Sequence, residues 1–179
     1  GIHCVDRFNG MFAFCLYDRQ DDSVYLVRDR IGKKPLYYEL CDDNIYFASE
    51  LKPLMKRPGF SEPVQTRVLS RYLFQQYINA PDTIFENVYK LNPGEILQFR
   101  YGTVKKWKYW DISEVYHRMQ QDPVTDYEKA KTELKELLRK AVSSRMIADV
   151  PLGAFLSGGY DSSLMTAIAQ EHSQKPLKT

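Results

Sequence analysis

The chain has 179 residues, with 25 lysines and arginines against 23 aspartates and glutamates, so it is long enough for a buried core and nearly neutral. Near-neutrality argues against the basic field of a nucleic-acid-binding protein and against an acidic disordered tail. The longest apolar run, residues 11–17, is far too short to cross a bilayer, and no secretory leader pattern is seen. We therefore expect a cytoplasmic protein with no nucleic-acid or membrane partner. Cys4, Cys15 and Cys41 lack metal-type spacing and are interpreted as reduced thiols.

The first 50 residues predict a series of strands. Residues 11–18 are apolar at both odd and even positions, which predicts a strand covered on both faces. Further strands are expected at residues 23–28, 36–40 and 45–49, separated by turns and by a charged loop at 28–35. A short helix from about residue 50 should end near Pro58 and Gly59.

The middle of the chain predicts a helix, a turn and a hairpin. Residues 68–78 carry apolar side chains at helical spacing, and Ala80, Pro81 and Asp82 break the pattern. Residues 91–94 (Leu-Asn-Pro-Gly) form a strong turn signal, followed by a hairpin of residues 95–100 and 104–110. Residues 112–125 gather polar side chains without regular periodicity, which indicates a linker between two domains.

The last third predicts a helix, a strand and a second helix. Thr125 and Glu128 fit a capping box that opens a helix running to about Ala148, with Leu134, Leu137 and Leu138 on its buried face. Residues 150–156 have the length and composition of a buried strand. Residues 164–172 form a good helix with no breaker before Pro176.

The turn between this strand and this helix, residues 157–163, contains the candidate binding residues. Amide groups at a helix start lack intrahelical partners and favour an anion, and Gly158 and Gly159 let a ligand approach the main chain. Ser157 and Ser162 add hydroxyl donors, and Asp161 offers a carboxylate of the kind that Mg²⁺ prefers. Phosphate binding is one interpretation. The alternative is a tight connection in which the serines serve only as caps.

The sequence Ser-Gly-Gly-Tyr-Asp-Ser at 157–162 resembles the pyrophosphate loop, S-G-G-x-D-S, of PP-loop ATP pyrophosphatases. With the preceding V-P-x-G-x-x-L pattern at 150–156, it is similar to the synthetase domain of glutamine-hydrolysing asparagine synthetases. The resemblance implies an ATP and pyrophosphate site of Leu156, Ser157, Gly158, Gly159, Asp161 and Ser162, with Leu156 against the nucleotide and Asp161 holding Mg²⁺. Tyr160 stands where that family often has leucine.

Three earlier segments, at 9–14, 28–38 and 47–52, resemble the later half of the glutaminase domain of the same family. The implied fold class is α+β and α/β: part of an N-terminal-nucleophile glutaminase, an αββα sandwich, at 1–111, a linker at 112–125, and at 126–179 the first helix, strand, loop and helix of an adenine nucleotide alpha hydrolase-like domain. The family's nucleophile is an N-terminal cysteine, whereas residue 1 is glycine. We therefore expect an internal fragment without glutaminase activity of its own.

For the whole enzyme, the resemblance implies an ATP-dependent amide ligase. It would convert aspartate and glutamine, or ammonia, to asparagine through β-aspartyl-AMP, with ATP and Mg²⁺ as cofactors, small-molecule substrates as partners and a homodimer as a possible assembly. Two alternatives stay open. One is a related carboxylate-adenylating enzyme, such as a β-lactam synthetase or a peptide-cyclising synthetase. The other is a short non-catalytic interaction protein that binds through an exposed sheet edge.

Overall fold

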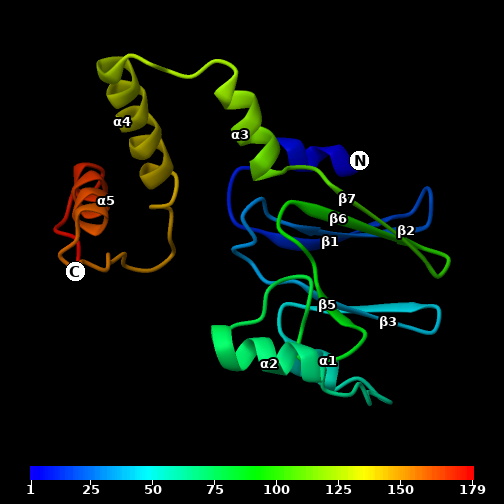
Figure 1. The fold of residues 1–179 in the computed structure, drawn as a ribbon. Helices are drawn as coiled ribbons and strands as arrows, with labels where there is room; N and C mark the ends of the chain where they lie inside the picture. The colour runs from blue at the N-terminus through cyan, green and yellow to red at the C-terminus, as the bar shows by residue number, and fades with distance from the viewer. The chain divides into compact units, whose positions relative to one another are not determined.

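The computed structural model describes all residues from 1 to 179 and divides them into two compact units, Gly1–Tyr116 and His117–Thr179. The first unit contains two antiparallel sheets, and the second contains helices and irregular segments (Figure 1). The helix α3 (Ile112–Gln120) crosses the division. This helix replaces the irregular structure expected for residues 112–120. Its apolar residues Ile112, Val115, Tyr116 and Met119 recur at helical spacing, although none of its residues is buried.

The first sheet has four strands in the order β1-β2-β6-β7, and the second has three in the order β4-β3-β5. The four-stranded sheet consists of β1 (Ala13–Asp18), β2 (Ser23–Arg28), β6 (Glu95–Arg100) and β7 (Thr103–Lys108). The three-stranded sheet consists of β3 (Tyr37–Cys41), β4 (Asn44–Ala48) and β5 (Val88–Lys90). The strands predicted in the first 50 residues and the hairpin after the turn at 91–94 are confirmed to within one or two residues.

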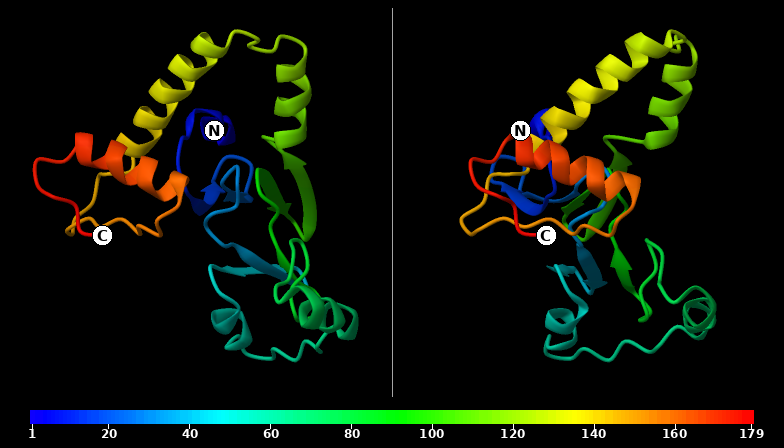
Figure 2. Two further views of the ribbon diagram at one scale, coloured as in Figure 1. Left: turned by 60° about the vertical axis from the view of Figure 1, so that its left-hand side comes forward. Right: turned by 90° about the vertical axis from the view of Figure 1, so that its left-hand side faces the viewer.

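A core of apolar side chains lies between the two sheets. Leu26 and Leu97 from the first sheet meet Leu36, Tyr38 and Leu91 on or beside the second. The other face of the first sheet packs against the 3-10 helix η1 (Ile2–Arg7), whose Val5 is buried with Val27 and Ile96. The helix α1 (Leu51–Met55) contacts β3 and β4, and α2 (Thr66–Gln75) lies on the same side (Figures 1 and 2). The unit is therefore layered as η1, sheet, sheet and helices.

The expectation that the first strand is covered on both faces is wrong. Cys15 lies opposite Leu26 across the β1–β2 pair, so the two side chains share the face between the sheets, yet Cys15 is exposed. Tyr17, two residues on, is exposed as well. The strand β1 is at the sheet edge, where the narrower three-stranded sheet leaves these side chains uncovered.

The charged loop after β2 is a buried polar anchor. Arg28 is only 7% exposed, and its guanidinium donates to the carbonyl oxygens of Gly32, Lys34 and Leu91 at 2.6–2.9 Å. Asp29 is 1% exposed, and its carboxylate accepts four backbone amides at 2.9–3.3 Å. Burial raises the pKa of Asp29, but the four amide donors outweigh it and lower the pKa overall. The loop thus fixes the main chain beside the intersheet core.

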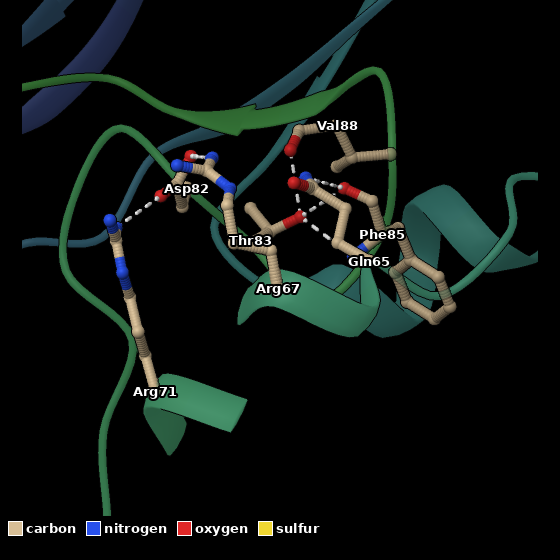
Figure 3. Close-up of polar contacts among 7 residues, drawn as sticks. All are labelled: Gln65, Arg67, Arg71, Asp82, Thr83, Phe85 and Val88. Carbon is tan, nitrogen blue, oxygen red and sulfur yellow. Dashed lines mark hydrogen bonds and ion pairs between the residues drawn. The ribbon is translucent and has the colours of Figure 1, made fainter. Parts of the chain in front are cut away.

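The segment between α2 and β5 is held by side chains that bond to the backbone (Figure 3). The buried Thr83 hydroxyl donates to the carbonyl of Val88 at 2.7 Å, and the Gln65 amide donates to the carbonyl of Phe85 at 2.8 Å. Asp82 pairs with two exposed arginines of α2, Arg67 at 3.6 Å and Arg71 at 3.5 Å. These contacts attach α2 to the end of the three-stranded sheet.

The second unit contains α4 (Tyr127–Ser143) and α5 (Tyr160–Glu171), joined by a bidentate Arg139–Glu171 pair at 2.9 and 3.2 Å. The cap of α4 is Asp126, whose carboxylate accepts the Lys129 amide at 2.6 Å, so the predicted capping box at Thr125 is wrong. An aspartate caps as well as a threonine, and the sequence offered both. The helix ends at Ser143 instead of near Ala148, and its expected core face is not buried.

The buried strand predicted at residues 150–156 is not formed. The segment makes one parallel bridge, between Gly153 and Lys178, and the Ala154 amide donates to the Lys178 carbonyl at 2.8 Å. Val150 and Phe155 are exposed. A parallel strand is buried only when neighbouring strands and covering helices lie on both sides, and this unit supplies a single bridge partner.

Candidate functional site

The start of α5 presents three backbone amides without acceptors. Gly159 is the N-cap in extended geometry, and no side chain caps the helix. The first amide to be satisfied is that of Ser163, which donates to the Gly159 carbonyl at 3.1 Å. The preceding amides, of Tyr160, Asp161 and Ser162, have no acceptor in the chain. Their partial positive charges, aligned with the helix dipole, create a site that favours an anion.

The two glycines before the helix differ in what their backbones require. Gly158 has φ +82°, in the left-handed region that side chains rarely adopt, so the turn itself requires glycine. Gly159 has φ −81° and ψ 163°, and an added Cβ would meet nothing closer than the Ser157 hydroxyl at 3.8 Å. The fold therefore does not require glycine at position 159.

The serine hydroxyls stabilise the turn. Ser157 Oγ and Ser162 Oγ lie 3.1 Å apart, and Ser162 Oγ donates to the Gly159 carbonyl at 3.2 Å. These bonds hold the loop against the first turn of α5 and use none of the free amides. They also fit the alternative in which the serines only order the connection, so they do not by themselves distinguish the two interpretations.

Asp161 is the carboxylate in the first turn of α5. Its side chain is exposed and forms no ion pair. No group of three His, Cys, Asp or Glu side chains in the chain could hold a metal ion. A Mg²⁺ ion at this turn would thus take one ligand from Asp161 and the others from phosphate oxygens and water, which is the usual way in which proteins bind Mg²⁺ with nucleotides.

A cavity of about 390 Å³ lies beside the loop, within the second unit. Its lining includes Phe155, Ser162, Met165 and Thr166, and the Thr166 hydroxyl is buried without a hydrogen-bond partner. The sequence gives no direct sign of this cavity, because the apolar residues 150–156 predict a buried strand. Part of that segment lines the cavity instead. Leu156 and Tyr160 are exposed on either side of the turn.

The geometry therefore brings together Ser157, Gly158, Gly159, Asp161 and Ser162 around the start of one helix. The chain thus consists of a first unit built on two sheets and a second unit that contains this loop. Residues 1–110 match the family profile of the glutamine amidotransferase domain, and residues 133–179 match that of asparagine synthase. The chain belongs to the family of glutamine-hydrolysing asparagine synthetases, of the glutamine amidotransferase class.

Relatives from distant organisms match almost the whole chain. A protein of Methanocaldococcus jannaschii is 36% identical over 175 residues, covering 96% of this chain and 33% of the relative. Asparagine synthetase (glutamine-hydrolyzing) 3 of Bacillus subtilis is 32% identical over 98% of this chain and 28% of its own length. The corresponding enzyme 2 of Arabidopsis thaliana is 32% identical over 98% of this chain and 25% of its own length. The chain thus spans between a quarter and a third of these relatives.

No helix of the protein is both long enough and apolar enough to span a membrane.

Proposed function

We propose that residues 156–162 form a PP-loop that binds the pyrophosphate group of ATP in an ATP-dependent asparagine synthetase. The observation that carries the proposal is the row of three free amides at the start of α5, beside a glycine that the fold does not require. The names of the relatives, which state asparagine synthesis with glutamine hydrolysis, supply the reaction. Aspartate, ATP, and glutamine or ammonia are the proposed substrates.

In this proposal the loop stabilises the leaving group of an adenylation. The side-chain carboxylate of aspartate attacks the α-phosphate of ATP, the bond to the β-phosphate breaks, and pyrophosphate leaves with its charge on the amides of Tyr160, Asp161 and Ser162. Ammonia then displaces AMP from β-aspartyl-AMP to give asparagine. Fixed donors suit this step because they need no reorientation as negative charge develops.

Mg²⁺ would neutralise charge on the phosphate oxygens, and Asp161 is the residue that would hold it. The exposed carboxylate in the first turn of α5 fits that role. The Ser157 and Ser162 hydroxyls keep the loop in its binding geometry. Leu156 is proposed to lie against the nucleotide base, where an apolar surface favours stacking over solvent.

The substitution Asp161→Asn separates the metal from the anion site. Without Mg²⁺ the variant should bind inorganic pyrophosphate at least as tightly as the wild type, because a like charge has been removed from the site. With Mg²⁺ the wild type should gain roughly tenfold in affinity, whereas the variant should gain little, since it lacks the carboxylate ligand. Isothermal titration calorimetry of the 179-residue chain, with and without Mg²⁺, measures both effects.

The reaction itself is tested in a full-length enzyme containing this chain. We expect pyrophosphate release to require aspartate, and Asp161→Asn to abolish most of it while glutamine hydrolysis continues. If Mg²⁺ increased the pyrophosphate affinity of the wild type and of Asp161→Asn equally, Asp161 would not be a ligand of the metal. Pyrophosphate release driven by a different carboxylate would favour a β-lactam or peptide-cyclising synthetase.

A further inference from the structure

A second cavity, of about 470 Å³, lies within the first unit. It opens where three hairpin turns meet: β1–β2, β3–β4 and β6–β7. Tyr17, Val24 and Phe99 lie directly opposite one another across β1, β2 and β6, so they share one face of the sheet. Val24 and Phe99 also pack against the intersheet core. The cavity is therefore the open end of the space between the sheets, with an apolar and aromatic floor.

Two of these turns contact each other beside the cavity. Gly102 has φ +71°, and a Cβ there would lie 2.8 Å from Oδ1 of Asp43. The tip of the β6–β7 hairpin thus contacts the β3–β4 turn of the other sheet. The volume lies within the range of roughly 300–1,000 Å³ that small-molecule sites occupy.

Charges of both signs line the cavity without pairing. Asp22 accepts the Tyr17 hydroxyl at 2.7 Å but forms no ion pair, and Asp43 forms none. Arg100 also lacks a carboxylate partner, and its guanidinium lies 5.1 Å from the centre of the Tyr101 ring. The cavity therefore offers two carboxylates and one guanidinium that no ion pair occupies.

We propose that this cavity binds a small zwitterion with an apolar body, most simply a free amino acid with an aliphatic side chain. Its ammonium group would lie against Asp22 and Asp43, where the tyrosine rings add cation–π attraction. Its carboxylate would meet Arg100, whose planar fork of donors suits that group. Its side chain would cover Val24 and Phe99. A purely cationic or purely anionic ligand would leave one of the lining charges unsatisfied.

The test compares three ligands of similar shape on the full chain: leucine, 3-methylbutylamine, which has no carboxylate, and 4-methylpentanoate, which has no ammonium. Two-dimensional amide NMR follows the signals of Asp22, Val24, Asp43 and Gly102 during each titration. Leucine should shift these signals and bind more tightly than either singly charged ligand.

Two variants remove one charge each, and each has a matched control. Asp43→Asn and Arg100→Gln should each weaken leucine binding about three- to fivefold, as expected for charge pairs at a rim. Asp42→Asn, in the same turn as Asp43, and Arg19→Gln, in the β1–β2 turn, should leave it unchanged. Leucine binding no tighter than that of the amine or the acid, or equal loss in the control variants, would overturn the proposal.

Discussion

Replacing Arg57 by methionine is expected to lower the melting temperature of the first unit by about 10 °C or more. Arg57 donates to both carboxylate oxygens of Glu39, Nε to Oε2 at 3.1 Å and Nη2 to Oε1 at 2.5 Å. Glu39 is on the central strand of the three-stranded sheet and is fully buried. Removing the arginine leaves a buried carboxylate without its partner, which is among the most destabilising single changes in a protein.

The guanidinium also lies over aromatic rings, 4.8 Å from the centre of Tyr46 and 6.0 Å from that of Phe60. The pair therefore joins β3 and β4 to the segment after α1. Both tryptophans of the chain, Trp107 and Trp110, are in the first unit, so their fluorescence during heating reports its unfolding.

Two comparisons make this prediction specific. The double variant Arg57→Met with Glu39→Gln should recover part of the loss, because a neutral amide is less costly to bury than an unpaired carboxylate. Arg71→Met removes an exposed pair with Asp82 and should shift the melting temperature by no more than about 2 °C. Equal effects of Arg57→Met and Arg71→Met would contradict a structural role for the buried pair.

Replacing Gly94 by alanine should lower the free energy of unfolding of the first unit by roughly 3 kcal/mol. Gly94 has φ +66°, and a Cβ would lie 2.3 Å from the carbonyl oxygen of Trp110. Its amide donates to the Asp29 carbonyl, and its own carbonyl accepts the amide of Tyr109. The backbone at position 94 thus joins the charged loop to the residues after β7, and it cannot move without breaking these bonds.

Gly59→Ala is the matched control for Gly94→Ala. Gly59 also has a left-handed backbone, φ +77°, but its nearest neighbour to an added Cβ is 3.8 Å away. The free energy of unfolding of this variant should therefore fall only by the cost of a left-handed backbone at a residue with a side chain, about 1 kcal/mol. Urea unfolding followed by tryptophan fluorescence measures both. Equal losses in the two variants would show that the close approach to Trp110 contributes nothing.

The sequence predicts the first unit well because its signals are local. Alternating and apolar runs define β2, β3, β4 and the β6–β7 hairpin, and the Pro93–Gly94 pair marks the turn before the hairpin. The predictions that were wrong concern burial, which depends on residues far away in the sequence. Cys15 looks buried in an apolar run, but only the width of the opposing sheet decides whether that face is covered.

The charged loop shows the same limit. Arg28 and Asp29 have the composition of a solvated turn, yet carbonyl and amide groups from residues as distant as Leu91 and Phe12 surround them. At the candidate site, the Ser-Gly-Gly motif located the turn, but the helix predicted from residue 164 already begins at Tyr160. The motif did not reveal that Gly159 has room for a side chain, which depends on the backbone angles and on the position of Ser157.

The most direct test of the pyrophosphate site is amide NMR of the chain titrated with inorganic pyrophosphate, for the wild type and for Gly159→Ser. A serine at this N-cap should stabilise α5, because its hydroxyl oxygen would accept a hydrogen bond from one of the free amides. That amide would then no longer be available to the anion. We expect pyrophosphate to shift the amides of Tyr160, Asp161 and Ser162, and the variant to bind about tenfold more weakly while its helix is at least as stable. Unshifted amides at these three positions, or undiminished binding by Gly159→Ser, would contradict the proposed function.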